Sequence, residues 1–208
     1  MSSIPPHQSN SKVVPLHSQA EANLAYIRST MQASTLFTGV SGKGMVLVGL
    51  SALLACRAAE SPASTPDGWV LIWLTEALVA AALSLFFMAR KVRGQGQVLW
   101  SVSGRKLLFA MAPALVAGAI LSLFLGFTPQ SWLLPTVWLL LYGAGVTTAG
   151  AHSIPIVPIM GGAFMMAGAL NGLNVALGLP LPAWLGMAAG FGGLHILFGT
   201  IIWRQHGG

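Results

Sequence analysis

Six long apolar segments constrain the fold of this chain more than any other feature of its sequence. A helix that crosses a membrane needs about 20 consecutive, mainly apolar residues, and six stretches meet that condition. They are residues 40–59, 69–89, 107–127, 132–151, 155–177 and 183–203. A transmembrane barrel would need strands that alternate apolar and polar residues, and runs such as 77–89 do not alternate. The sequence therefore predicts an all-α fold, a polytopic membrane bundle of six transmembrane helices.

The composition excludes the main alternatives to a membrane protein. Hydrophobic residues make up 55% of the 208 residues and charged residues only 7%, whereas a soluble domain carries about 25% charged residues. High hydrophobicity argues against a disordered chain, and the single cysteine, Cys56, excludes a disulfide scaffold. The connections between the apolar segments are too short for a soluble catalytic domain. Any chemistry must therefore lie in the bundle, at its rims or in the first 40 residues.

The basic residues are distributed very unevenly over the predicted topology. Nine of the ten Lys and Arg residues fall on one side, and only Arg57 falls on the other. The positive-inside rule then places both termini in the cytoplasm. Five of these cations lie in the connection between the second and third segments: Arg90, Lys91, Arg93, Arg105 and Lys106. We expect them to contact anionic lipid headgroups or, alternatively, an acidic partner. Because orientation explains the net charge of +6, we expect no nucleic-acid partner.

The N-terminal part of the chain divides into a polar tail and a helix. Residues 1–18 have no apolar core behind a basic start, so they do not resemble a cleaved signal peptide. Residues 19–38 are predicted to form an amphipathic helix. Its apolar side chains share one helix face, at Ala20, Leu24, Ile27 and Met31. The favoured interpretation is a helix lying on the cytoplasmic membrane surface; the alternative is a docking helix for a cytoplasmic partner.

Polar groups inside the membrane are costly, and each is a functional hypothesis. Glu76 is the only acidic residue within the predicted spans, and His195 lies near the middle of the sixth. Asn171 and Asn174 lie in the outer half of the fifth. If the second and sixth spans are neighbours, Glu76 and His195 can share a water-filled cavity and relay protons. The alternative is a set of polar contacts between helices, with the carboxyl of Glu76 in its neutral form.

No cofactor or metal site is predicted. Two haem-ligating histidines must approach the iron from opposite sides at similar depth, but His195 lies roughly 12 Å deeper in the membrane than His152. A metal site needs clustered His, Cys, Asp or Glu residues, which the sequence does not show. Ser41 lies in a Gly-x-Ser-Gly stretch at the edge of the first span, too far in depth from His195 for a nucleophile and its base. We therefore expect no enzyme active site.

Glycine is concentrated in the last two spans. Gly168 and Gly172, and likewise Gly186 and Gly190, are separated by three residues. Such spacing of small residues lets membrane helices approach closely. The motifs therefore predict tight helix packing, and the alternative is a mobile pair of helices that lines a substrate path.

Three stretches carry a resemblance to a known group of proteins. They are Tyr26 to Ser34 with Phe37 and Thr38, then Val157 to Gly161, and finally Ala189 to Ile196 with Phe198, Gly199 and the closing Arg204, His206, Gly207 and Gly208. Together these stretches resemble a group of uncharacterised bacterial integral membrane proteins of about this length. The resemblance implies a location in the bacterial inner membrane. It implies no activity, cofactor or catalytic residue.

Three functions remain in competition on the sequence alone. The favoured one is a non-enzymatic accessory, sensory or scaffold component, with the lipid bilayer and a membrane or cytoplasmic protein as its partners. The second is a small, proton-coupled transporter that uses Glu76 and His195 and predicts a cavity also lined by Asn171 and Asn174. The third is a membrane enzyme, which would need a nucleophile or a metal cluster facing a cleft.

Overall fold

The structure, a computed structural model, describes residues 16–34, 36–179 and 181–208. The chain divides into two units, residues 1–35 and 36–208. The described residues of the first unit form helix α1 (Leu16–Ser34). Its start includes three residues that the sequence assigned to the polar tail, and residues 1–15 of that tail lie outside the described residues.

The second unit is a helical bundle, and its elements confirm the predicted all-α, six-span fold. Six helical stretches are long and apolar enough to cross a membrane. The elements are α2 (Gly42–Ala59), α3 (Pro66–Gly94), α4 (Val102–Leu125), the 3₁₀ turn η1 (Ser131–Leu133), α5 (Leu134–Gly150), α6 (Ile156–Ala176), α7 (Ala183–Met187), the π-helical segment η2 (Ala188–Leu194) and α8 (His195–His206). Since α7, η2 and α8 follow one another directly, they form the sixth span together.

Capping residues set where the first three spans begin. The hydroxyls of Ser41, Thr65 and Ser101 each accept a hydrogen bond from the backbone N–H three residues later. Each hydroxyl thereby satisfies one of the free N–H groups of a helix start. The helices α3 and α4 consequently begin three and five residues earlier than the apolar segments that predicted them, 69–89 and 107–127. Helix α3 also continues to Gly94, into the basic connection.

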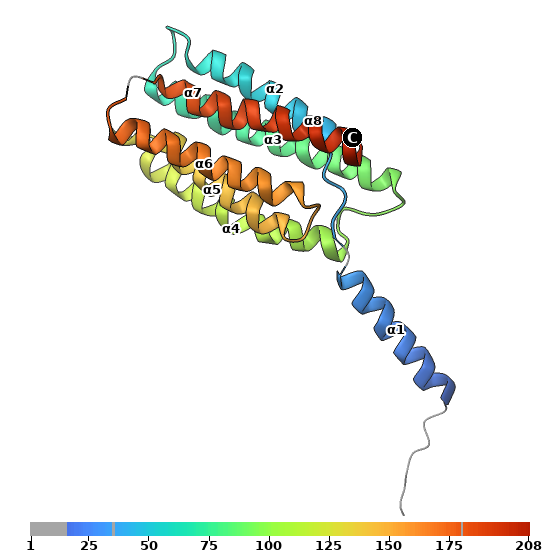
Figure 1. Cartoon of the computed structure of the whole chain (residues 1–208). Coiled ribbons are helices and arrows are strands. Elements are labelled where there is room, and N and C mark those ends of the chain that lie inside the picture. Colours follow the sequence, from blue (N-terminus) through green and yellow to red (C-terminus); the bar gives the residue numbers. More distant parts are fainter. Residues whose placement is uncertain (1–15, 35, 180) are drawn as a thin grey trace, which may run out of the picture. The chain divides into compact units, whose positions relative to one another are not determined.

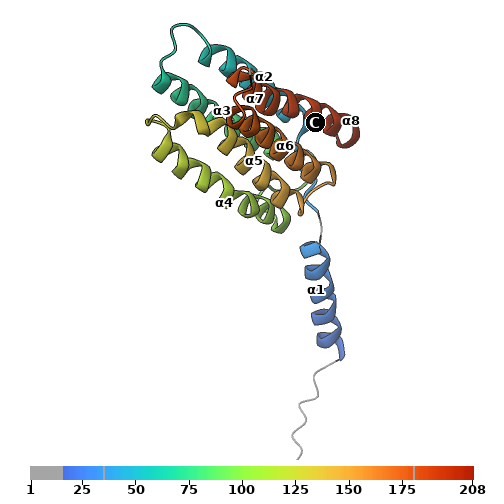
Figure 2. The same cartoon turned by 60° about the vertical axis from the view of Figure 1, so that its left-hand side comes forward.

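The six spans form two layers. Figures 1 and 2 show α2, α3 and the α7–η2–α8 span in one layer and α4, α5 and α6 in the other. Within the first layer α2 packs against both α3 and α8, and within the second α5 packs against both α4 and α6. The sixth span also contacts α5 and α6 through α7 and η2. The sixth span therefore connects the two layers.

Glycines bring the two central helix pairs into backbone contact. A Cβ atom added at Gly49 of α2 would lie 2.7 Å from the carbonyl oxygen of Gly192 in η2. Likewise, a Cβ at Gly143 of α5 would lie 2.7 Å from the carbonyl oxygen of Gly161 in α6. Without a side chain at these positions, the helices can approach until their backbones touch. The sequence motifs had not singled out Gly49 or Gly143.

The glycine motifs that the sequence did single out also serve packing. A Cβ added at Gly168 would come within 2.9–3.0 Å of Leu140, and one at Gly172 within 3.1 Å of Thr136, both on α5. In the sixth span, Gly186 faces the side chain of Asn171, and Gly190 faces Leu139. The predicted tight packing is therefore confirmed at all four glycines.

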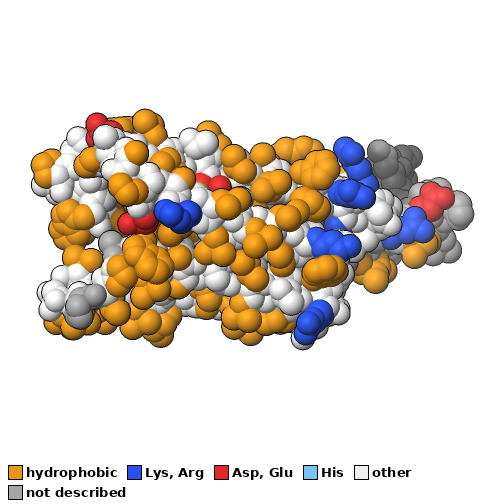
Figure 3. Space-filling view, turned by 90° about the horizontal axis from the view of Figure 1, so that it is seen from above, with side chains coloured by type: hydrophobic (Ala, Val, Ile, Leu, Met, Phe, Trp, Pro, Cys, Tyr) orange, Lys and Arg blue, Asp and Glu red, His pale blue; other side chains and the backbone are white. Residues whose placement is uncertain are grey.

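Helices α3 and α4 lie at the outside of the bundle. In the most apolar stretch of each, only 11% of the residues are buried, against 33–44% in the other four spans. Their buried residues lie toward the helix ends and are Val70, Trp73, Val92, Gly104, Leu107 and Ser122. Figure 3 shows hydrophobic side chains spread over one face of the molecule. An apolar exterior is what a lipid bilayer requires of a multi-pass membrane protein.

The end of the bundle where α2 begins and α8 ends is called the basic end here, because Lys43, Lys91 and Arg204 lie there. The ammonium group of Lys91 donates hydrogen bonds to the carbonyl oxygens of Val40 (2.8 Å), His206 (2.8 Å) and Gly207 (3.1 Å). An ammonium group has three N–H donors, so all three are used. Lys91 therefore ties the end of α8 to the segment before α2.

Phe37 corrects the predicted end of the N-terminal helix. The sequence predicted a helix over residues 19–38, but α1 ends at Ser34. Phe37 instead pairs with Ser153 through an isolated parallel bridge. Its N–H donates to the His152 carbonyl at 2.8 Å, and its own carbonyl accepts from the Ser153 hydroxyl at 2.8 Å. Phe37 is also buried. The periodicity of apolar residues had extended the helix into a segment that packs in the bundle.

Candidate functional site

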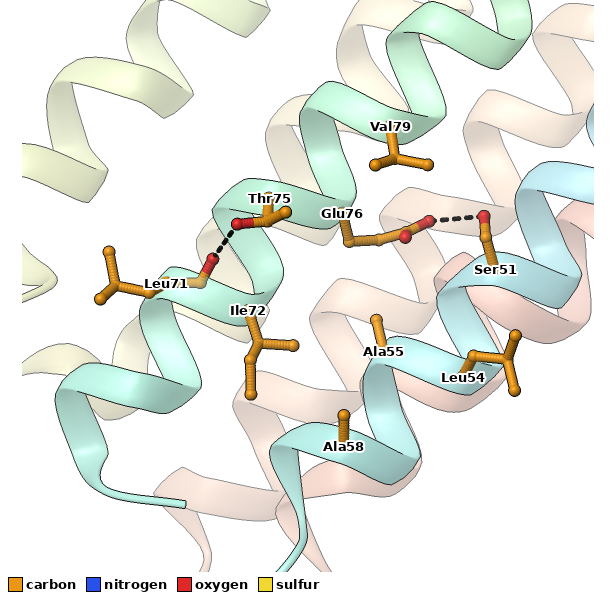
Figure 4. A pocket seen from close by; sticks show the side chains of 9 residues that line it. All are labelled: Ser51, Leu54, Ala55, Ala58, Leu71, Ile72, Thr75, Glu76 and Val79. Atoms are coloured by element: carbon orange, nitrogen blue, oxygen red, sulfur yellow. Dashed lines mark hydrogen bonds between the residues drawn. The ribbon is translucent and has the colours of Figure 1, made fainter. Parts of the chain in front are cut away.

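Glu76 lies in the span α3 and faces the neighbouring helix α2. The hydroxyl of Ser51 on α2 donates a hydrogen bond of 2.8 Å to Oε1 of Glu76. Figure 4 shows the two side chains pointing toward each other across the space between the helices. The sequence identified Glu76 as a candidate but not Ser51. The pair joins two adjacent helices of one layer.

An open groove lies beside this pair and is called the Glu76 groove here. It has a volume of about 480 Å³ and is lined by residues of α2 and α3 alone. The small side chains of Ala55 and Ala58 make space on α2, and Ile72 and Val79 contribute apolar surface from α3 (Figure 4). Glu76 is the one ionisable side chain among the described residues that line it. The groove therefore combines an apolar wall with a single carboxyl group.

The hydrogen bonding of Ser51 suits either protonation state of Glu76. The Ser51 oxygen lies 2.8 Å from Glu76 Oε1 and 2.9 Å from the carbonyl oxygen of Val48. A hydroxyl has one hydrogen and can also accept. When Glu76 is ionised, Ser51 can donate to it. When Glu76 is protonated, its O–H can donate to Ser51, which then donates to Val48. A proton can therefore enter or leave without moving the heavy atoms.

His195 is the second candidate, and its surroundings are closed. It begins α8, directly after η2, and only 4% of its surface is exposed. Its Nδ1 lies 2.9 Å from the carbonyl oxygen of Phe191, and its Nε2 lies 2.8 Å from the hydroxyl of Tyr142 on α5. Since a carbonyl oxygen only accepts, Nδ1 carries the hydrogen. In the neutral ring Nε2 then accepts from Tyr142.

Aromatic rings surround this histidine. Tyr142, Phe164 and Phe191 have ring centroids 5.4, 5.1 and 6.3 Å from that of His195, and the four residues are called the His195 cluster here. Tyr142 and Phe164 come from the second layer, whereas Phe191 and His195 come from the sixth span. Rings at these separations attract one another beyond the burial of their surface. The cluster therefore holds the two layers together.

The aromatic contacts continue from this cluster toward the opposite end of the bundle. Trp73 of α3 lies 6.2 Å from Phe191 and 6.1 Å from Trp69, which stacks on Trp138 of α5 at 5.8 Å. The indole N–H of Trp138 donates to Ser122 of α4 at 2.8 Å. In contrast, the buried indole N–H of Trp73 has no hydrogen-bond partner among the residues that the structure describes. These rings link α3, α4 and α5 where the layers meet.

The backbone beside the cluster is a π-helix. Segment η2 contains Phe191 and is rich in small residues, Ala-Ala-Gly-Phe-Gly-Gly-Leu. Segments of π-helix inside α-helices are rare in proteins, but those that occur are frequently at functional sites. Its glycines also touch α2, as the contact between Gly192 and Gly49 shows. The periodicity of apolar residues could not predict the π-helix. That periodicity locates a span, but it does not show whether a single turn within the span is wider than the others.

Asn171 and Asn174 have hydrogen-bond partners at the end of the bundle away from the basic end. Asn171 donates to the Thr136 hydroxyl on α5 at 2.9 Å. Asn174 donates to the Leu181 carbonyl at 3.0 Å, in the connection that follows α6. Both asparagines are buried, although no described residue forms a hydrogen bond with Oδ1 of Asn174. Each amide therefore fixes a neighbouring helix or connection in place.

In the part of the chain that the structure describes, the four residues that the sequence grouped into one polar site have separate hydrogen-bond partners. Glu76 bonds to Ser51, His195 bonds to Tyr142 and Phe191, and the asparagines bond elsewhere. His195 does not line the Glu76 groove. Sequence reasoning missed Ser51 and Tyr142. Tyr142 carried a signal, because it is the only tyrosine within the predicted spans.

The predicted basic contact surface is only partly available to a partner. Arg90, Arg93 and Arg105 are exposed, and contact with anionic lipid stays a prediction for them. Lys91 directs all three of its N–H groups to backbone carbonyls. Lys106 is exposed but makes an interaction of its own. Lys91 therefore stabilises the fold at the basic end of the bundle.

The described residues offer little to a metal or a haem. No group of three or more His, Cys, Asp and Glu side chains comes together in this part of the chain. For His195, both ring nitrogens already have protein partners. Iron ligation there would break the bond to Tyr142 or to Phe191.

Comparison with known proteins adds no assignment. No family model, no curated protein and no solved structure matches the chain.

Proposed function

We propose that this chain is a non-enzymatic accessory, sensory or scaffold component of a membrane. In this proposal the six-span bundle is the anchor, and helix α1 is the element that meets a partner. The orientation signal in the basic residues supports a cytoplasmic location for both termini. Together with the resemblance to bacterial integral membrane proteins, it supports the bacterial inner membrane as the location.

The observation that carries the proposal is the exposed apolar face of α1. The helix spans 19 residues and belongs to a unit separate from the bundle. Every residue from 19 to 31 is exposed, and Leu24, Ile27 and Met31 on the apolar face are 61%, 51% and 65% exposed. Apolar side chains at helical spacing gain free energy when a groove or a membrane surface covers them. The face is therefore suited to an intermolecular contact.

A partner protein and the membrane surface make different demands on this face. A helix that binds a protein groove depends on a few anchoring side chains. A helix that lies in the membrane interface depends on total apolar area and on attraction to anionic lipids. We propose the protein partner as the function and treat membrane association as the competing outcome of the test.

The test is native mass spectrometry of the protein released from its own membranes in lipid nanodiscs. We expect a stoichiometric protein mass above the 21.6 kDa chain. That mass should be lost in Leu24→Asp/Ile27→Asp but kept in Ala22→Asp/Ser29→Asp, a matched pair of substitutions on the opposite face of the helix. Loss in both double variants, or in neither, would contradict docking through this face. Binding of an α1 peptide to anionic vesicles, with no retained protein, would favour the membrane surface instead.

A small, proton-coupled transporter using Glu76 and His195 is the second candidate. Two observations favour it: the Ser51–Glu76 pair is satisfied in both protonation states, and His195 adjoins a π-helix. Its test is proton-driven uptake into proteoliposomes that contain the purified chain. Under this candidate, Glu76→Gln and His195→Gln should each abolish proton coupling, while Glu60→Gln should leave it intact. Uptake that ignores Glu76→Gln would refute the role in coupling.

A further inference from the structure

The Glu76 groove has three properties that together define a ligand. It is large enough for a small molecule, since its volume of about 480 Å³ falls in the range of about 300–1,000 Å³ typical of ligand pockets. Apart from the hydroxyls of Ser51 and Thr75, its lining other than Glu76 is apolar. The Thr75 hydroxyl already donates to the Leu71 carbonyl at 2.8 Å. The polar character of the groove therefore comes from Glu76 and Ser51.

The position of the carboxyl group makes its ionised form dependent on a partner. Glu76 is ten residues from the start of α3, which places it about 15 Å from that helix end. Ser51 lies near the middle of α2 (Gly42–Ala59). A charged carboxylate at such a depth is stable only when a partner compensates the loss of water. Ser51 supplies one hydrogen bond but no positive charge.

No basic side chain lines the groove among its described residues. Arg57, the nearest basic residue to Ser51 in the sequence, is exposed and lies outside the lining. When Glu76 is ionised, the positive charge that complements it therefore comes from another molecule. Because the rest of the wall is apolar, that molecule must also carry apolar groups.

The groove opens to the side of the bundle. Leu54 on α2 and Leu71 on α3 belong to its lining and are 73% and 52% exposed. In Figure 4 both side chains point away from the space between the two helices. In a bilayer these exposed leucines face the hydrocarbon. A ligand that enters between them must therefore already be soluble in the membrane.

We propose that the Glu76 groove binds a lipophilic organic monocation, with its charge at the Glu76 carboxylate and its apolar groups against α2 and α3. A neutral amphiphile would leave the carboxylate without a counter-charge, and an anion would be repelled by it. The Ser51 hydroxyl keeps the carboxylate oriented toward the groove. This site is independent of α1, so the docking function can fail without affecting it.

Tetraphenylphosphonium is a suitable probe, and tetraphenylborate is a control of the same shape and opposite charge. Equilibrium dialysis of the purified full chain in detergent should show saturable binding of the cation at one site and none of the anion. Removal of the charge in Glu76→Gln should weaken cation binding at least about tenfold, as expected for a desolvated charge pair that loses one partner. Glu60→Gln removes an exposed carboxylate in the same way and should change the affinity by less than about twofold.

A second variant distinguishes the contribution of the Glu76 charge to binding from that of the open space in the groove. Ala55→Leu keeps Glu76 but fills the groove and should also weaken binding at least about tenfold, because the apolar groups lose their place. Ala58→Leu serves the same purpose if Ala55→Leu does not elute as a single folded species. Wild-type affinity in Glu76→Gln would overturn the proposal. Equal affinity for cation and anion, or no cation binding by the folded wild-type chain, would overturn it as well. The variant Leu24→Asp/Ile27→Asp should bind the cation normally, which keeps this test distinct from that of the docking function.

Discussion

The Glu76 groove and the His195 cluster accommodate an ionisable side chain in two opposite ways. His195 is buried, both of its ring nitrogens are bonded, and three aromatic rings enclose it. Glu76 has one protein partner and borders an open groove. A polar group in a membrane is stable when its hydrogen bonds are satisfied internally. The closed cluster meets that condition alone, whereas the Glu76 carboxyl group borders open space that, in our proposal, a further molecule fills.

The two regions also differ in what they connect. The His195 cluster takes side chains from α5, α6 and the sixth span, so it joins the two layers. The Glu76 groove lies between α2 and α3, within one layer. Damage to the cluster should therefore cost stability, whereas changes in the groove should alter binding with little effect on stability. Three sets of substitutions test this contrast, and all are compared through the free energy of unfolding in mixed detergent micelles.

The largest effect is expected where α2 supports the backbone beside the His195 cluster. In Gly49→Leu the new Cβ would lie 2.7 Å from the Gly192 carbonyl oxygen and 3.0 Å from the Ile196 nitrogen. Backbone atoms cannot move aside as side chains do, so we expect a loss of about 3 kcal/mol or more. Gly162→Leu is the matched control, since nothing lies within 4 Å of a Cβ there. It should change the free energy by less than about 0.5 kcal/mol. Equal losses of unfolding free energy in Gly49→Leu and Gly162→Leu would contradict the conclusion that backbone contact at Gly49 holds α2 against the sixth span.

A smaller effect is expected within the cluster itself. Tyr142→Phe removes the donor to His195 Nε2 and leaves a buried acceptor without a partner, which costs about 1–3 kcal/mol. His195→Leu leaves the Tyr142 hydroxyl unpaired in the same surroundings and should cost about as much. The double variant Tyr142→Phe/His195→Leu should lose less free energy of unfolding than the two single variants added together. Each single variant leaves one group of the same hydrogen-bonded pair without a partner, whereas the double variant removes both groups. If the losses in the two single variants simply add up in the double variant, the hydrogen bond between Tyr142 and His195 contributes nothing to stability.

The smallest effect is expected in the groove. Glu76→Gln keeps the shape of the side chain and an oxygen that can accept from Ser51. We therefore expect the free energy of unfolding to change by less than about 0.5 kcal/mol. Under the monocation proposal, the same variant loses ligand binding. A destabilisation as large as that of Tyr142→Phe would mean that Glu76 is a structural residue like His195.

The fold could be predicted from the sequence because hydrophobicity alone identifies membrane spans. All six apolar segments correspond to helical spans of the structure. The boundaries were less accurate where capping by Thr65 and Ser101 starts a helix before the apolar run begins. Phe37 was wrongly placed in a helix, since an apolar residue at helical spacing can equally belong to a buried extended segment.

The arrangement of the polar groups could not be predicted, because it depends on which helices are neighbours. The expected cavity required the second and sixth spans to bring Glu76 and His195 together. Instead α2 packs against both of these spans and supplies Ser51 to Glu76. Tyr142 reaches His195 from the other layer. Depth along a helix can be estimated from residue counts, whereas the direction in which a side chain points requires the packing.

Nitrogen NMR of the histidine rings in lipid bilayers tests the separation of the two regions most directly. The His195 resonances are assigned by their loss in His195→Gln. We predict a neutral ring with hydrogen on Nδ1, where it bonds to Phe191, and none on Nε2, where Tyr142 donates. The same signals should persist in Glu76→Gln. A changed tautomer or protonation state of His195 in Glu76→Gln would contradict the account and show that the two residues act as one site.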